Sequence, residues 1–201
     1  MNVEVVRARY GAVRAAAGPA VTVVAATKYV SLDDMAVLAE AGVEVVGENR
    51  AQDLLAKHAA FGDAFRWHFI GHLQSNKAKA VDRVCELVHA VDTDSTARRL
   101  TVPWLLEVNL SGEATKAGVA PEEVGAWVAR YPGLRGLMSM PPLTADPEGS
   151  RPWFRRLRQL AAEHGLPDVS MGTSQDWRVA VEEGATHVRV GSALWSDDGR
   201  P

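Results

Sequence analysis

Short runs of apolar and β-branched residues recur along the chain, and stretches with helical periodicity separate most of them. Runs of this kind, bounded by turn-forming residues, are typical of strands that are buried on both faces of a sheet. Eight strands that alternate with helices favour an α/β fold of the (β/α)8 barrel type over a doubly wound sheet. We expect strands at 21–26, 43–47, 66–70, 87–91, 103–110, 134–138, 168–171 and 187–191.

Helix signals lie between most of these runs. Ser31, with an acidic residue three positions later, is typical of a capping box and predicts a helix over 31–41. Pro121, followed by two glutamates, predicts another helix over 121–130. The connection 92–102 is short for a full crossover helix, so we expect the barrel wall to be reduced there.

The composition is that of one soluble domain. A chain of 201 residues, 47% hydrophobic and 23% charged, can bury one large core, and we expect residues 1–201 to form a single domain. The net charge of −3 argues against binding to nucleic acid or to an anionic membrane, and no run is apolar enough to span a bilayer. The only cysteine, Cys85, lies in the stretch 80–88, which we expect to be helical. Because one cysteine excludes an intrachain disulfide framework, the cytoplasm is the simplest compartment.

Polar and small residues follow the predicted strands, at the face where a barrel carries its functional site. Lys28 comes at the end of the first strand. A lysine amine that lies against an apolar wall loses its proton more readily and can attack a carbonyl carbon. The alternative is a structural lysine whose stem covers apolar surface while its amine reaches water. The residues that follow the other strands include Asn49, His72, Asn109, Met138, Ser174 and Ser192.

Two of these loops are suited to binding phosphate. Residues 172–174 (Gly-Thr-Ser) and 191–192 (Gly-Ser) each precede a helical stretch, after the seventh and eighth strands. Small residues let backbone N–H groups approach an anion, and barrels often bind phosphate at this place. The alternative for each loop is a turn glycine followed by an N-cap serine. Neither loop is a P-loop or a GxGxxG motif, so a nucleotide is not indicated.

A phosphate site opposite a strand-end lysine suggests pyridoxal 5′-phosphate (PLP). The aldehyde would form a Schiff base with Lys28, and the phosphate would contact Ser174, Gly191 and Ser192.

Several sequence blocks carry a more specific resemblance. They are ATKYVS, GENRAQDLLAKH, WHFIGHLQSNKAK, LLEVNLSGEATKAG, GLMSMPP and SMGTSQDWRVAVEEGATHVRVGSA. Together they resemble the PLP homeostasis protein family, which shares the barrel of the N-terminal domain of alanine racemase. The chain differs from the usual family pattern at Thr173, where a methionine is common. The resemblance implies that the cofactor contacts are Lys28, Asn49, His72, Met138, Ser174, Gly191 and Ser192.

Arg189 precedes Gly191 by two residues, a spacing that resembles the racemase pattern in which an arginine faces the pyridine nitrogen of PLP. A guanidinium is cationic and has no acceptor, so it keeps that nitrogen unprotonated. A neutral pyridine is a poor electron sink, which disfavours transaminase or decarboxylase chemistry. The alternative is that Arg189 only pairs with a carboxylate such as Glu183.

Three functions follow from these residues. The first is a non-catalytic PLP carrier or regulator, the second a weak PLP-dependent amino-acid racemase, and the third a cofactor-free aldolase-type barrel. Racemisation needs an acid or base on each face of the substrate carbon, and we expect Tyr10, Tyr29 and Tyr131 to lie outside the site loops. The phosphate and pyridine residues disfavour the aldolase.

The carrier hypothesis is therefore preferred, with PLP as ligand and apo PLP-dependent enzymes as candidate partners. We expect a monomer. The pair His68 and His72 spans a strand and a turn rather than one helix, so we expect no metal site.

Overall fold

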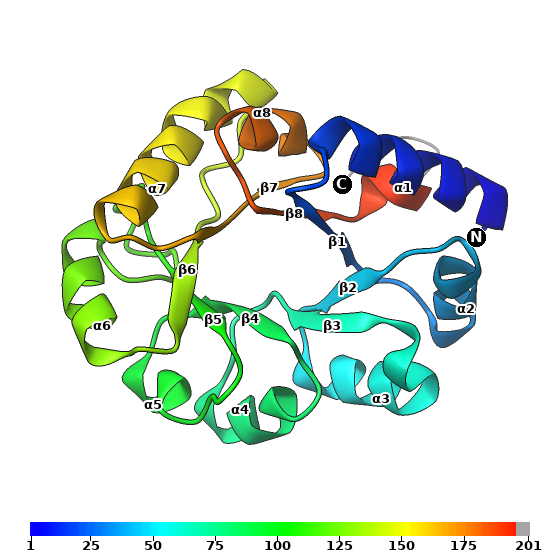
Figure 1. Ribbon diagram of the computed structural model, residues 1–201, viewed down its shortest axis with the longest axis horizontal. Helices are drawn as coiled ribbons and strands as arrows, with labels where there is room; N and C mark the ends of the chain where they lie inside the picture. Colours follow the sequence, from blue (N-terminus) through cyan, green and yellow to red (C-terminus); the bar gives the residue numbers. More distant parts are fainter. Residues whose placement is uncertain (196–201) are drawn as a thin grey trace.

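Eight parallel strands close into a barrel in the computed structural model, which describes residues 1–195 (Figure 1). Each strand pairs with the next along the chain, and the last pairs with the first. The predicted single barrel of eight strands is confirmed. The strands are β1 (Thr22–Ala26), β2 (Val45–Glu48), β3 (Arg66–Phe69), β4 (Leu87–Val91), β5 (Trp104–Glu107), β6 (Leu134–Met138), β7 (Asp168–Thr173) and β8 (His187–Val190).

Helices surround the barrel on its outside (Figure 1). Ser31 caps the second helix, since its hydroxyl accepts a hydrogen bond of 3.1 Å from the Asp34 backbone N–H, as predicted. The longer helices are α1 (Val3–Ala17), α2 (Leu32–Glu40), α3 (Ala51–Phe61), α4 (Ser75–Asp82), α6 (Val124–Arg130), α7 (Arg151–Glu163) and α8 (Trp177–Glu182). The short ones are α5 (Asp94–Ala97), α9 (Ser192–Trp195) and the 3-10 turns η1 (Gly62–Ala64), η2 (Pro121–Glu123) and η3 (Pro147–Ser150).

The crossover between β4 and β5 is reduced, as the short connection predicts. Its helix α5 has 4 residues. The Asp82 carboxylate holds the chain that follows, because it accepts hydrogen bonds from the backbone N–H groups of Thr101 (2.6 Å) and Val102 (3.0 Å). Burial opposes ionisation of Asp82, but these hydrogen bonds outweigh it and keep its pKa below the usual value.

The segment around Cys85 is not helical, so that prediction is wrong. Helix α4 ends at Asp82, and the chain turns through Val84 and Cys85 before β4 begins. The turn is required because β4 must leave the helical layer to pair with β3 and β5. The thiol is buried, and burial raises its pKa to about 12, as expected for a cysteine that only fills space.

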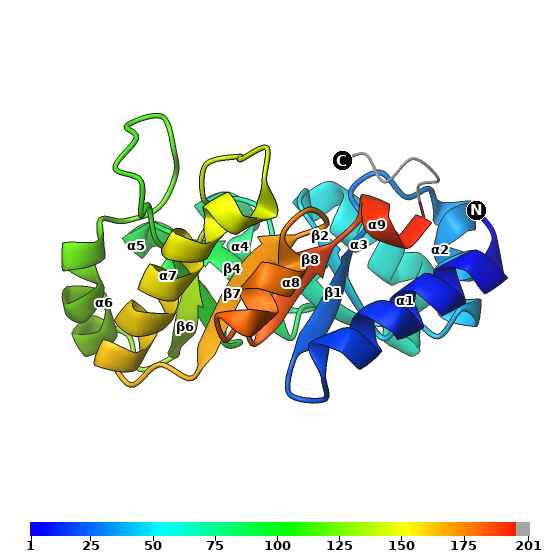
Figure 2. The same ribbon diagram turned by 90° about the horizontal axis from the view of Figure 1, so that it is seen from above.

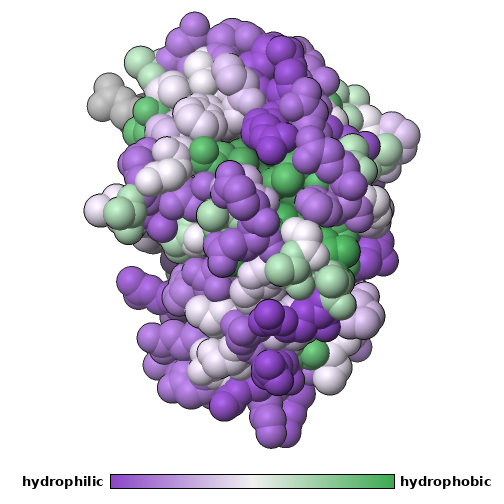
Figure 3. Space-filling model, turned by 90° about the vertical axis from the view of Figure 1, so that its left-hand side faces the viewer, coloured by the Kyte–Doolittle hydropathy of each residue, from purple (hydrophilic) through white to green (hydrophobic). Residues whose placement is uncertain are grey.

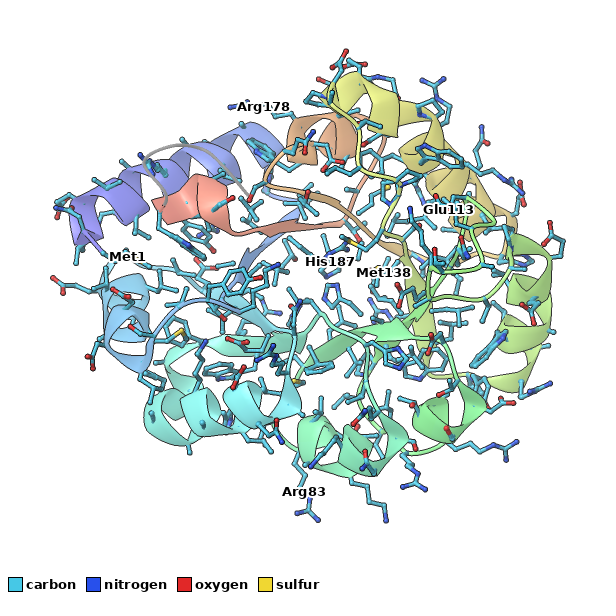
Figure 4. The ribbon with its side chains drawn as sticks, turned by 180° about the vertical axis from the view of Figure 1, so that it is seen from behind. Met1, Arg83, Glu113, Met138, Arg178 and His187 are labelled. Carbon is cyan, nitrogen blue, oxygen red and sulfur yellow. The ribbon has the colours of Figure 1, made fainter. Side chains whose placement is uncertain are left out.

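The barrel interior is polar at its centre. Along β3, Trp67 and Phe69 belong to the outer core under the helices, so the intervening His68 points inward. By the same alternation Ser170 and Arg189 point inward from β7 and β8, and both are buried. The pairing of β4 is irregular at His89, which is also buried and lies with them because its ring is hydrogen-bonded to Ser170 and His68. Figure 4 shows two further residues, Met138 and His187, in the middle of the barrel.

The two faces of the barrel differ. The long connections after β5 and β6 project from one face, the one at which the parallel strands end (Figure 2). Around the side covered by α6 and α7, hydrophilic residues predominate on the surface, with smaller apolar groups between them (Figure 3). None of the helices within residues 1–195 is long and apolar enough to cross a membrane.

At Gly136, strand β6 lies too close to β7 to leave room for a side chain. A Cβ atom at this position would lie 1.9 Å from the backbone carbonyl oxygen of Asp168 in β7. We therefore expect Gly136→Ala to lower the free energy of unfolding by more than about 2 kcal/mol. Gly11→Ala on the exposed face of α1 is the control, since its Cβ would meet nothing within 4 Å and should stabilise by up to about 1 kcal/mol. Urea unfolding followed by tryptophan fluorescence measures both, and equal midpoints would contradict this account.

Candidate functional site

Strand pairing brings most of the predicted site residues to one end of the barrel. Because β1 pairs with both β2 and β8, the residues that follow these strands, Lys28, Asn49 and Gly191, lie on neighbouring strands at the same face. Ser174 follows β7, the next strand round, and His72 follows β3. The pairing of the strands is thus enough to bring together residues that are far apart in the sequence.

Lys28 lies just beyond β1 with an exposed side chain. Its Nζ lies 4.8 Å above the centre of the Tyr29 ring, a cation–π contact. The expectation that all three tyrosines lie outside the site loops is therefore wrong for Tyr29, which adjoins the predicted cofactor lysine and is 86% exposed.

A buried ion pair lies beneath Lys28. Glu48, at the end of β2, is fully buried and accepts hydrogen bonds from Lys57 Nζ and from the Thr27 hydroxyl (2.6 Å). Lys57 also donates to the Thr27 backbone carbonyl at 2.8 Å. The residue that precedes Lys28 is thus held from two sides. This pair is not among the residues predicted from the sequence, although Lys57 follows Leu54 by three positions and so lies on the buried face of α3.

The two predicted phosphate loops meet in space. The Ser174 hydroxyl accepts hydrogen bonds from the backbone N–H groups of Gly191 (2.9 Å) and Ala193 (3.4 Å), where α9 begins at Ser192. Gly172 has a φ of +87°, and a Cβ there would lie 2.5 Å from the Ala180 Cβ. A glycine is therefore required for this turn, and the Ser174 hydroxyl joins the two loops while its own hydrogen can still be donated.

Arg189 is buried in the barrel without a carboxylate partner in the part of the chain that the structure describes. Its Nη1 donates to the Ser170 hydroxyl, and its Nη2 donates to the Ser139 carbonyl (3.2 Å) and to Met140 Sδ (2.9 Å). Burial lowers its pKa to about 10, while Glu107 and Asp176 act against the shift, so the guanidinium stays protonated at neutral pH.

The alternative role for Arg189 is wrong. Glu183, its proposed partner, forms ion pairs with Arg151 and Arg155 of α7, both at 2.9 Å. A buried cation without a carboxylate is costly, and such groups concentrate at functional sites.

Asn49 and His72 line a pocket of about 210 Å³ that lies between the starts of α3 and α4. The Asn49 Oδ1 atom is buried there without a hydrogen-bond partner. His72 is exposed, and its Nδ1 lies 3.6 Å from Asp92 Oδ2. Glu107 completes this group at the end of β5, and burial together with Asp92 raises its pKa, while Arg189 and His72 act against the rise.

Met138 and a second pocket lie towards β5 and β6. The Met138 side chain is buried in the barrel interior with Leu87, Ala90 and Leu105. The pocket, of about 220 Å³, is bounded by the loops after these strands. The residues that line this second pocket are Glu107, Val108, Asn109, Lys116, Ala117, Met140, Pro141 and Leu143. Lys28, Ser174 and Ser192 line neither of the two pockets.

Sequence relatives share a name. The PLP homeostasis protein of Aquifex aeolicus is 41% identical over 177 residues, which cover 78% of each chain. That of Pseudomonas aeruginosa is 42% identical over 180 residues, covering 80% of this chain and 78% of the relative. That of Deinococcus radiodurans is 38% identical over 213 residues, covering 98% and 100%.

Solved structures share the barrel. PipY of Synechococcus elongatus with PLP bound superimposes with a TM-score of 0.87 at 31% identity, over 95% of this chain and 100% of PipY. Alanine racemase of Corynebacterium glutamicum, at 19% identity, shares the fold with a TM-score of 0.72, over 97% of this chain and 61% of the racemase. The sequence family described as alanine racemase, N-terminal domain, matches residues 1–198. From the barrel, the relatives and this match together, the chain belongs to the PLP homeostasis protein family.

Proposed function

We propose that this protein binds PLP at the carboxyl end of its barrel and acts as a non-catalytic carrier or regulator in intracellular PLP homeostasis. The observation that carries the proposal is the junction of β7, β8 and β1, where a strand-end lysine, a phosphate-type loop and a buried arginine occur on neighbouring strands. The PLP bound in PipY, a relative of similar length, supports the same ligand here. Apo PLP-dependent enzymes are the candidate recipients.

The residues present fit this cofactor. The Ser174 hydroxyl, which accepts from the N–H groups of Gly191 and Ala193, can donate its own hydrogen to a phosphate, and Lys28 has an exposed amine for a Schiff base with the aldehyde. Arg189 offers a buried cation without a carboxylate, and Asn49 an acceptor without a donor. When bound, PLP supplies an aldehyde for amines and a ring that can withdraw electrons.

Arg189 also supports the lack of turnover. Because its guanidinium is protonated and has no acceptor, it would leave the pyridine nitrogen of PLP neutral. A neutral ring stabilises a carbanion poorly, which argues against racemase, transaminase and decarboxylase activity.

One observation favours the second candidate, a weak racemase. His72 and Asp92 follow β3 and β4, and Glu107 is the last residue of β5. These strands lie on the other side of the barrel mouth from Lys28, and the ligand-type atoms of the three residues lie within 4.8 Å of one another. Such groups could exchange a proton at a second face of a substrate. Activity measurements therefore decide between carrier and racemase.

The Schiff base makes the first prediction about function. We expect the protein with PLP to show a visible absorbance band that borohydride abolishes, with the reduced cofactor attached to the Lys28 peptide in mass spectrometry. Lys28→Ala should lack the band, because no other amine is placed at the end of β1. Lys77→Ala, in the neighbouring pocket, is the control and should keep the band. Attachment of the cofactor at Lys77 would refute the assignment.

The phosphate contacts make a second prediction. Ser174→Ala should weaken PLP binding by about 1–3 kcal/mol, the range for loss of a charge-assisted hydrogen bond. Ser95→Ala, on the exposed surface of α5, is the matched control and should bind PLP normally. Equilibrium dialysis measures the affinities. Pyridoxal without its phosphate should bind far more weakly than PLP, and equal affinities would exclude a phosphate site in these loops.

Turnover is the third test. We expect no exchange of the α-proton of alanine with solvent deuterium at enzyme-like rates, followed by NMR beside chiral analysis of the product. Arg189→Glu, if it folds, should increase side reactions because a carboxylate can keep the pyridine nitrogen protonated. Exchange with inversion at about 1 per second or faster in the unchanged protein would favour the racemase over the carrier.

A further inference from the structure

A chain of buried side chains crosses the barrel and ends on Arg189. Arg189 Nη1 donates to Ser170 Oγ, which lies 2.8 Å from His89 Nδ1, and His89 Nε2 lies 2.9 Å from His68 Nδ1. The four residues come from β8, β7, β4 and β3, so the chain links opposite walls of the barrel. All four are at most 5% exposed.

The histidines of this chain are neutral. Burial lowers the pKa of His68 to about 3, and His187 and Arg66 add to the effect. Burial likewise lowers the pKa of His89 well below its usual value, with help from the neighbouring His68, His187 and Arg189. The two histidines therefore supply no counter-charge to the guanidinium. A neutral imidazole donates at one nitrogen and accepts at the other, so the hydrogen bonds along these side chains have a fixed direction.

The acceptors around Arg189 are unevenly distributed. Ser170 accepts from Nη1, while the Ser139 carbonyl and Met140 Sδ accept from Nη2. A guanidinium has about five N–H donors. Within residues 1–195, neither the Nε–H nor the second N–H of Nη1 donates a hydrogen bond, and both remain for a ligand.

We propose that Ser170 and His89 are positioning residues for Arg189. His89, held in turn by His68, orients the Ser170 hydroxyl, and this hydroxyl fixes the rotation of the guanidinium so that its remaining donors face the ligand. That the ligand is the pyridine ring of PLP rests on the proposed function. The orientation of Arg189 belongs to the protein itself and is present before any ligand binds.

His187 provides a matched control inside the same barrel. Its ring lies 5.4 Å from that of His89 and 5.9 Å from that of His68, so it shares their surroundings. Its Nδ1 is 2.9 Å from the Thr186 hydroxyl, and it has no hydrogen bond to Ser170 or Arg189. Replacement of His187 should therefore disturb packing without releasing the guanidinium.

The first experiment uses the protein without PLP. Side-chain ¹H–¹⁵N NMR, with the Arg189 signals assigned from Arg189→Lys, reports the mobility of the guanidinium. We expect Ser170→Ala and His89→Leu to shift and broaden these signals, whereas His187→Gln leaves them unchanged. His89→Asn keeps a hydrogen-bonding group near the position of Nδ1 and should restore much of the wild-type signal. Unchanged Arg189 signals in Ser170→Ala would overturn the proposal, and urea midpoints identify any variant that fails to fold.

The second experiment measures PLP binding. Ser170→Ala and His89→Leu should bind PLP about three- to tenfold more weakly and shift the visible band, as expected for a misdirected hydrogen bond. His187→Gln should show neither effect. A wild-type protein that binds no PLP would refute the proposed function, while the NMR result would still decide on the positioning role. Normal PLP spectra and affinities in all variants would refute the link between the hydrogen-bonded side chains and PLP binding.

Discussion

The pairing of β1 with β8 closes the barrel, and the site depends on that closure. Four parallel residue pairs, from Thr22 with His187 to Ala25 with Val190, set the register between the first and last strands. This register sets Arg189 opposite Val24 and Gly191 beside Ala26, so the end of β1, which leads into Lys28, lies next to the loop after β8. No local sequence signal could bring these residues together, so the chemistry of the site is a consequence of completing the sheet.

A second constraint is the cost of burying charge inside that sheet. The Glu48–Lys57 pair resolves it by mutual neutralisation and a hydrogen bond to the backbone of Thr27. Arg189 resolves it through neutral acceptors only, which leaves the guanidinium with unused donors. The first arrangement supports the backbone beneath Lys28, whereas the second leaves a charged group ready for a ligand.

The sequence predicted the parts of the fold that local patterns encode. All eight strands, the Ser31 cap and the reduced crossover at α5 follow from runs of apolar residues, capping chemistry and segment length. The meeting of Ser174 with Gly191 was also predictable, because barrels commonly bring the seventh and eighth loops together.

The remaining features depend on tertiary contacts that have no local pattern. The apolar neighbours of Cys85 predict a helix, but pairing of β4 requires a turn there. His68 and His89 occur in apolar runs and are far apart in the sequence, so their hydrogen bond emerges only when β3 and β4 are adjacent. The contact between Lys28 and Tyr29 has no sequence pattern either, because two adjacent residues can point their side chains in different directions.

The contrast between a rigid base and an exposed amine bears on how such a protein would hold and release a cofactor. Thr27 is fixed by Glu48 and Lys57, whereas the exposed Lys28 side chain places its amine over the exposed Tyr29 ring in a cation–π contact. A covalent link at such a lysine would hold the aldehyde while leaving it accessible to a competing amine. In an enzyme, water-excluding closure strengthens electrostatic stabilisation of the transition state. An exposed lysine forgoes that gain, which supports the proposed carrier role over chemistry on a bound substrate.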